Sequence, residues 1–366
     1  MIIQPTEYNP IPPTHIFGVY WDGSQSSSML RTDDAALFAE PAPYVSGATS
    51  YSSPFDDVLP WSGIEIVDDS EAGKLVKIPK FWYKWTRDSE VTGDMKLQIA
   101  DHEVDGFYVS PAHADRGDGS GERDYVYVGR YHCSSSDYKS TSGVLPKTNI
   151  TRSTARSGIS NLGTKVWQWD YAMLWTIRML YLVEYADWNS QAKIGYGCGN
   201  NSSRENTGST DSMPYHTGTM QSSRGTYGVG CQYRYIEDLW GNVLDWCDGI
   251  YFSGSTVYGI KNPANFSDSS GGTNIGTRAA SGNCIKAWTN PSASGFEYAL
   301  YPSEGISDSS YEIYICDRSF YESSGVVLYV GGYYGQYQSN GLFYVSGDYS
   351  TSGSFSFIGS RLQKLP

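Results

Sequence analysis

The sequence is short of charge, and above all of positive charge. Charged residues make up 18% of the 366 residues, against roughly 25% in an average soluble domain. The 26 basic residues are outnumbered by 39 acidic ones, which gives a formal net charge of −13. A chain of this sign is unsuited to attracting a phosphate backbone or an anionic membrane surface. Nucleic acid is therefore not an expected partner.

Segments that would direct the chain into a membrane are also missing. The first residues, Met-Ile-Ile-Gln-Pro-Thr-Glu, have neither the basic nor the apolar region of a signal peptide. The longest apolar stretch, residues 172–185, is too short to span a bilayer and includes Arg178 and Glu184. We therefore expect a chain that is made in the cytoplasm and is not inserted into a membrane.

Motifs for metal binding and nucleophilic catalysis are absent as well. The five histidines show no HxxxH or HxxH spacing and the six cysteines no CxxC pair, so a zinc site has no support. The acidic loop at residues 115–124 could hold calcium, although its spacing is not that of an EF-hand. There is no Gly-x-Ser-x-Gly sequence. The sequence predicts no catalytic residue, no metal site, no cofactor, and six buried free thiols.

Aromatic residues and glycine are what the chain has in quantity, with 31 Tyr and 40 Gly in a sequence that is 39% hydrophobic. Residues 1–75, with many turn formers, are predicted to form a small β-rich domain for attachment or oligomerisation. Residues 76–366 are predicted to form the main, ligand-binding domain. The expected fold class is α+β, with helices at 151–162 and 166–188, short antiparallel strands and long irregular loops. The second helix is apolar on nearly every side, which indicates burial, and little regular structure is expected after Gly195.

The run from Val326 to Ile358 has an unusual composition. Its only charge is Asp348, and most of the rest is Tyr, Ser, Gly and Phe. This is the composition of an antibody paratope, in which tyrosine supplies contact area while serine and glycine supply adaptable hydrogen bonding. An antiparallel β core with glycine turns would explain Leu328, but not tyrosines such as Tyr333 among glycines. We interpret the run as a ligand-binding surface.

Three stretches together resemble a known group of proteins. Residues 235–246, Tyr-Ile-Glu-Asp-Leu-Trp-Gly-Asn-Val-Leu-Asp-Trp, resemble the Gly-Asn-Val-x-Glu-Trp signature of the C-type-lectin-like fold in formylglycine-generating enzymes. Residues 182–195 and 329–362 resemble a helix and the variable region of the variable proteins of diversity-generating retroelements, notably those of gut bacterial phages and prophages. The resemblance covers roughly residues 75–366. It implies a C-type-lectin-like main domain with a variable region at about 326–361.

In that group a reverse transcriptase miscopies adenines, which changes Asn codons into codons for Tyr, Ser, Asp, Phe or Gly. The resemblance implies a receptor-binding protein of a phage tail, with other tail proteins as partners and a homo-oligomer as an assembly. It would bind a protein or glycan at the outer surface of a bacterial cell. It implies a structural role for Trp240, Asn242 and Trp246. The positions it implies as diversified and ligand-binding are Tyr329, Tyr333, Tyr334, Gln336, Tyr337, Gln338, Ser346, Asp348, Tyr349, Phe355 and Phe357.

Two alternatives stay open. The first is an oxidoreductase of the formylglycine-generating type. Those enzymes bind copper through a closely spaced cysteine pair near the carboxy terminus, whereas Cys284 and Cys316 lie far apart in this sequence. The second is a calcium-dependent sugar-binding lectin, which a calcium titration without a thermal shift would exclude.

Overall fold

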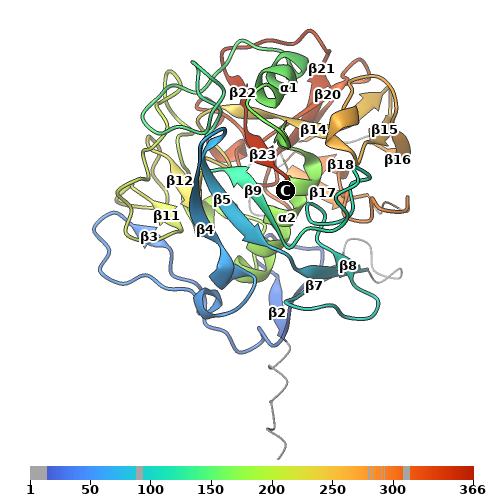
Figure 1. Cartoon of the computed structure of the whole chain (residues 1–366). Coiled ribbons are helices and arrows are strands. Elements are labelled where there is room, and N and C mark those ends of the chain that lie inside the picture. Colours follow the sequence, from blue (N-terminus) through green and yellow to red (C-terminus); the bar gives the residue numbers. More distant parts are fainter. Residues whose placement is uncertain are drawn as a thin grey trace, which may run out of the picture.

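The computed structural model describes residues 15–87, 94–278, 281–282, 284–289, 291, 293–307 and 314–366. In this part of the chain the strands form five sheets (Figure 1). The first sheet is antiparallel and consists, in spatial order, of β2 (Leu30–Asp33), β1 (Ile16–Trp21), β7 (Met95–Ala100), β6 (Trp82–Thr86) and β8 (Tyr108–Val109). The second consists of β10 (Val166–Gln168), β23 (Leu362–Lys364), β9 (Tyr125–Gly129), β5 (Gly73–Pro79) and β4 (Glu65–Asp69).

The fourth sheet carries the carboxy-terminal run. It consists of β16 (Thr273–Thr277), β15 (Thr256–Gly259), β14 (Leu244–Ser253), β20 (Val327–Val330), β21 (Val345–Tyr349) and β19 (Ser319–Tyr321), with β22 (Ile358–Ser360) parallel to the first residues of β14. The third sheet contains β13 (Ile236–Glu237), β12 (Cys231–Tyr233), β11 (Gly218–Thr219) and β3 (Tyr44–Val45). The fifth pairs β17 (Cys284–Trp288) with β18 (Pro302–Ile306).

Three α-helices occur in the described residues: α1 (Arg152–Ser160), α2 (Tyr171–Tyr185) and α3 (Ser190–Lys193). Four 3-10 helices are shorter: η1 (Pro54–Asp57), η2 (Trp61–Gly63), η3 (Pro263–Asn265) and η4 (Tyr337–Ser339). The helix predicted at 151–162 is confirmed as α1, where the Thr151 side chain accepts a hydrogen bond from the Thr154 backbone N–H. The helix predicted at 166–188 begins later than expected. Residues 166–168 form β10, and Asp170 caps α2 by accepting from the Met173 backbone N–H.

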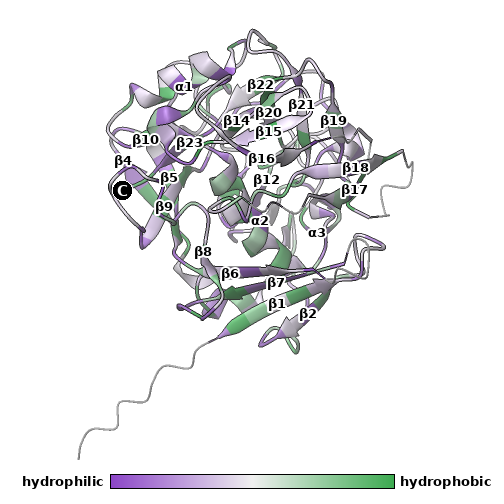
Figure 2. Ribbon diagram, turned by 90° about the vertical axis from the view of Figure 1, so that its right-hand side faces the viewer, coloured by the Kyte–Doolittle hydropathy of each residue, from purple (hydrophilic) through white to green (hydrophobic). Residues whose placement is uncertain are grey.

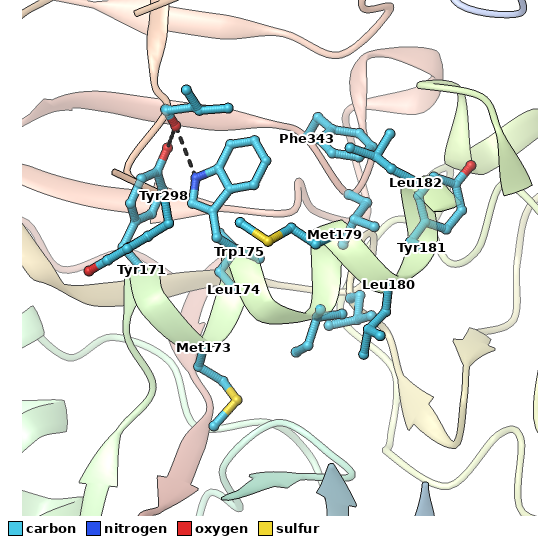
Figure 3. Packing of buried hydrophobic residues seen from close by; sticks show 14 of the residues in the cluster. Tyr171, Met173, Leu174, Trp175, Met179, Leu180, Tyr181, Leu182, Tyr298 and Phe343 are labelled. Carbon is cyan, nitrogen blue, oxygen red and sulfur yellow. Dashed lines mark hydrogen bonds between the residues drawn. The ribbon is translucent and has the colours of Figure 1, made fainter. Parts of the chain in front are cut away.

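Helix α2 is the centre of the hydrophobic core. All fifteen of its residues are buried, which confirms the expectation for a helix with apolar side chains on every face. It contacts β1 and β7 of the first sheet and β14 of the fourth, and Figure 2 shows these sheets on two sides of it. At its amino-terminal end Tyr171 and Trp175 both donate hydrogen bonds to the Leu300 carbonyl, at 2.5 and 2.9 Å (Figure 3).

The predicted fold class, an α+β C-type-lectin-like domain with two helices, short strands and long irregular loops, is wrong. The described residues are mostly β, with 33% strand and 12% helix, and their strands belong to several sheets. The expectation of little regular structure after Gly195 fails for the same reason. Strand β14 is ten residues long, and nine of these residues are buried. A strand buried on both faces does not alternate polar and apolar residues but forms an apolar run, and in β14 Asp245, Asp248 and Gly249 interrupt that run.

The run from Lys74 to Trp85, in which polar and apolar residues alternate, is divided between two sheets. Strand β5 ends at Pro79, which has no N–H to donate to a ladder, and the chain then enters β6. The expected domain boundary between residues 75 and 76 falls within β5. That strand pairs with β4 before the boundary and β9 after it, and the division into two domains stays a prediction.

Candidate functional site

Six aromatic rings near the carboxy terminus form a continuous series, which we call the aromatic row. Centroids of successive rings are 5.2, 4.7, 5.3, 4.3 and 5.1 Å apart, about the separation at which aromatic rings attract each other. The last ring of the row is buried and the other five are half-buried. The row therefore starts in the core and continues along the surface. In spatial order it consists of Tyr334, Tyr333, Phe357, Phe355, Tyr349 and Tyr329.

The buried end of the row rests on Trp246. The Tyr329 ring meets the Trp246 ring edge to face, with centroids 5.8 Å apart, and its hydroxyl donates a hydrogen bond to the Asp348 carboxylate. Ser346 donates to the same carboxylate oxygen at 3.0 Å. Burial raises the pKa of the Tyr329 phenol far above its usual range and that of Tyr344 to about 12. Both phenols are therefore neutral at physiological pH and available only as hydrogen-bonding groups.

Two glycines let the chain turn directly after β20 and expose the next two tyrosines. Gly331 and Gly332 have φ values of 92° and 94°, in the left-handed region that side chains avoid. A Cβ on Gly331 would lie 2.8 Å from the Leu239 carbonyl oxygen, and one on Gly332 would lie 2.0 Å from the Asn340 side-chain oxygen. Glycine is therefore required at both positions by conformation as well as by space.

A buried arginine of α2 holds the returning strand from behind. The Arg178 Nε donates to the Leu342 carbonyl at 3.0 Å, and its Nη2 donates to the Tyr344 carbonyl at 3.4 Å. Its guanidinium lies 5.4 Å from the centre of the Phe343 ring. Because these contacts fix residues 342–344 to the core helix, they also fix the start of β21, which presents Tyr349.

The positions implied as diversified differ widely in exposure. Tyr337 is 52% exposed and Gln338 is also exposed, whereas Tyr329 and Ser346 are 4% and 1% exposed and do not face solvent. Gln336 donates to the Tyr344 hydroxyl at 3.0 Å. The structure brings six of these positions together in the aromatic row, namely Tyr329, Tyr333, Tyr334, Tyr349, Phe355 and Phe357, and their role in ligand binding stays a prediction.

Sequence reasoning missed two tyrosines beside this surface. The Tyr227 ring lies 5.9 Å from the Tyr337 ring and 4.8 Å from the Tyr196 ring. Both missed residues come from loops between residues 195 and 230, and the Asn201 backbone N–H in these loops donates a hydrogen bond to the Tyr334 carbonyl. The signal that could have found them is compositional, since this segment is also rich in Gly, Ser, Asn and Tyr.

The three positions implied as structural are all buried. The Trp240 indole donates to the Gly195 carbonyl at 2.9 Å, and the Trp246 indole donates to the Ile150 carbonyl at 2.9 Å. Asn242 has a positive φ of 58°. Its side-chain oxygen accepts from the Glu205 backbone N–H at 2.9 Å, so the amide ties the loop before residue 207 to the turn.

The groups required by the two alternative functions are placed as follows. All six cysteines are buried free thiols, as predicted, and burial raises the pKa of Cys316 well above its usual range. Such thiols are poor nucleophiles and poor metal ligands. Within the described ranges, no group of three or more His, Cys, Asp or Glu side chains is placed to hold a metal ion. In the same part of the chain, no helix has the length and apolarity needed to cross a membrane.

The sequence matches no protein-family model, and comparison with curated proteins finds no significant match.

Proposed function

We propose that this protein is a receptor-binding protein of a phage or prophage tail that uses the aromatic row to bind a protein or glycan on a bacterial surface. The observation that carries the proposal is the row itself: five half-buried rings lie side by side in a run whose only charge is Asp348. Soluble proteins rarely leave contiguous aromatic surface uncovered unless it binds something.

The chemistry of the row suits binding by contact. A tyrosine offers a large apolar face and a hydroxyl, and it loses little conformational freedom on binding because it has few rotatable bonds. Asp348, the one charge, already accepts hydrogen bonds from Tyr329 and Ser346. Affinity would therefore come from aromatic burial and neutral hydrogen bonds, with a few rings contributing most of it.

The resemblance to variable proteins of diversity-generating retroelements supports the same proposal, because the whole row falls in the implied variable region. A C-type-lectin-like fold is not part of this proposal. The protein would be made in the bacterial cytoplasm, assembled with other tail proteins, and act at the outer surface of the target cell.

The direct test measures binding of the labelled protein to a panel of whole gut bacterial cells. Replacing Tyr333, Tyr334, Tyr337 and Tyr349 together by serine should weaken binding at least 100-fold, since a central interface tyrosine contributes about 2 kcal/mol. The double variant of Tyr334 and Tyr337 disturbs less packing and should weaken it at least tenfold. Binding that survives the fourfold change would show that the surface is assigned wrongly.

The matched control replaces two exposed tyrosines elsewhere, Tyr20 and Tyr125, which are 36% and 40% exposed. This variant should bind cells as the native protein does. A second test is genomic: the retroelement hypothesis requires a near-copy of the coding segment for residues 326–361, differing mainly at adenines, beside a reverse transcriptase gene.

A further inference from the structure

A cavity of about 180 Å³, which we call the polar cavity because five charged residues line it, lies away from the aromatic row and shares no residue with it. Its walls come from the β6–β8 edge of the first sheet, from the loop at residues 111–122, and from the segments around residues 261 and 295–298. A cavity of about 150 Å³ is large enough to hold benzene. The polar cavity therefore has room for one small organic molecule.

Two cations line the cavity, and among the described residues only one of them, Arg116, has a carboxylate partner. The Arg116 side chain is 3% exposed, and its Nε donates to the Lys261 carbonyl at 2.8 Å while its Nη2 pairs with Asp170. The third nitrogen, Nη1, is buried with no hydrogen-bond partner among the described residues. The Lys261 ammonium has no carboxylate within 4.0 Å in that part of the chain. The wall thus contains one cation, Lys261, that no carboxylate of the described residues neutralises.

The position of the Lys261 ammonium depends on a glycine. A Cβ on Gly295, whose φ is 79°, would lie only 1.7 Å from the Lys261 Nζ, so the ammonium occupies the space that any other residue would fill. The same ammonium lies 5.5 Å from the centre of the Phe296 ring. The loop at 295–297 therefore holds the lysine at the cavity wall.

The opposite charge is also present and also unpaired. Glu297 and Asp115 line the cavity, and each carboxylate accepts one backbone N–H at 2.8 Å, from Gly295 and Gly117 respectively. Neither makes an ion pair within 4.0 Å in the described residues. A carboxylate has about four acceptor sites, so each keeps several free for a ligand.

The remaining walls are largely aromatic. Tyr83, Tyr108 and Tyr298 line the cavity, with the Tyr83 and Tyr108 rings 5.9 Å apart. Tyr298 lies next to Tyr171 at the start of α2 (Figure 3). Tyrosine faces attract an ammonium group by the cation–π interaction and also cover an apolar side chain.

We propose that the polar cavity binds a small zwitterion, a molecule of amino-acid size that carries both a carboxylate and an ammonium group. The carboxylate pairs with Lys261, and the ammonium pairs with Glu297 against the tyrosine faces. A ligand of one sign would leave either the Lys261 ammonium or the Glu297 and Asp115 carboxylates unpaired. A zwitterion satisfies both sets at once.

The test titrates the full chain with each of the twenty L-amino acids, followed by isothermal calorimetry and ligand-observed NMR. At least one should bind with a dissociation constant below 10 mM. Two analogues of that amino acid, one that keeps only the carboxylate and one that keeps only the amino group, should each bind at least tenfold more weakly. If none of the twenty binds, or if an analogue with a single charge binds as tightly as the parent, the proposal is wrong.

Two variants assign the charges and leave the Arg116–Asp170 pair intact. Lys261→Gln should weaken binding of the amino acid, and of the analogue that keeps only the carboxylate, at least tenfold, and it should leave binding of the analogue that keeps only the amino group unchanged. Glu297→Gln should weaken binding of the amino acid, and of the analogue that keeps only the amino group, at least tenfold. It should leave binding of the analogue that keeps only the carboxylate unchanged. Lys74→Gln and Glu65→Gln, at exposed ion pairs elsewhere, are the matched controls and should bind like the native protein. Equal weakening of both analogues by either cavity variant would contradict the assignment.

Discussion

Among the eleven positions implied as diversified, substitution of a buried side chain should lower the free energy of unfolding much more than substitution of an exposed one. Tyr329 is 4% exposed, packs on Trp246, and donates to Asp348, whereas Tyr337 is 52% exposed. A buried tyrosine removes roughly 200 Å² from water, worth about 5 kcal/mol at about 25 cal/mol per Å², and large buried aromatic residues cost 3–5 kcal/mol when truncated. Tyr329→Ala should therefore lower the free energy of unfolding by about 4 kcal/mol. Tyr337→Ala should lower it by less than about 0.5 kcal/mol.

Urea unfolding followed by tryptophan fluorescence measures both changes, because Trp246 reports on the surroundings of Tyr329. Tyr329→Phe is the control that keeps the ring and removes only the hydrogen bond to Asp348, and it should cost about 1–2 kcal/mol. Equal losses for Tyr329→Ala and Tyr337→Ala would refute the reasoning that one position supports the fold and the other is free to vary. A Tyr329→Phe loss as large as that of Tyr329→Ala would place the stabilising interaction in the hydroxyl instead of the ring.

Three further predictions concern buried groups and backbone shape. Burial lowers the pKa of His113 to about 4, so the unfolded chain binds a proton first as the pH falls from 6.5 to 4. The free energy of unfolding should therefore decrease by on the order of 3 kcal/mol over this window, and His113→Gln should remove that decrease. Burial raises the pKa of Asp317 to about 7, so here it is the folded chain that holds the extra proton. Stability should therefore be lost as the pH rises from about 4 to 7, and Asp317→Asn should abolish this loss. Gly241 has a φ of 80°, and a Cβ there would lie 3.0 Å from the Cys198 carbonyl oxygen. Gly254 has a φ of 56°, and nothing lies within 4 Å of a Cβ there. Gly241→Ala should therefore lower the free energy of unfolding by at least about 2 kcal/mol, against about 1 kcal/mol for Gly254→Ala.

Stability measured by urea unfolding at several pH values checks the first two of these predictions, and at pH 7 alone it checks the third. A pH dependence unchanged by the His113 and Asp317 substitutions would mean that other groups cause it. Equal losses in the free energy of unfolding for Gly241→Ala and Gly254→Ala would mean that the backbone near Cys198 moves to accept the new Cβ without strain.

The local elements that the sequence predicts correctly are those whose pattern is complete within a short segment. Helix α1 has its capping threonine and an amphipathic pattern, and α2 has an unbroken apolar run that only burial explains. The extent of the strands after Gly195, which we expected to be short and few, was underestimated because several of their hydrogen-bond partners are distant. Strand β14 pairs with β15, β20 and β22, the last more than a hundred residues further along the chain. The resemblance to a lectin-like fold, carried by short motifs such as residues 235–246, did not determine the architecture.

The sequence by itself determined the composition of the candidate surface: a run with one charge and many tyrosines among glycines and serines, together with the glycines that its turns require. Only the tertiary structure decided which of those tyrosines face solvent, because burial depends on the neighbours that β14, α2 and the loops at 195–230 supply. It also decided which charged side chains meet in the polar cavity. Lys261 and Arg116 are 145 residues apart in the chain, and no local pattern encodes the distance between two side chains that the fold brings together.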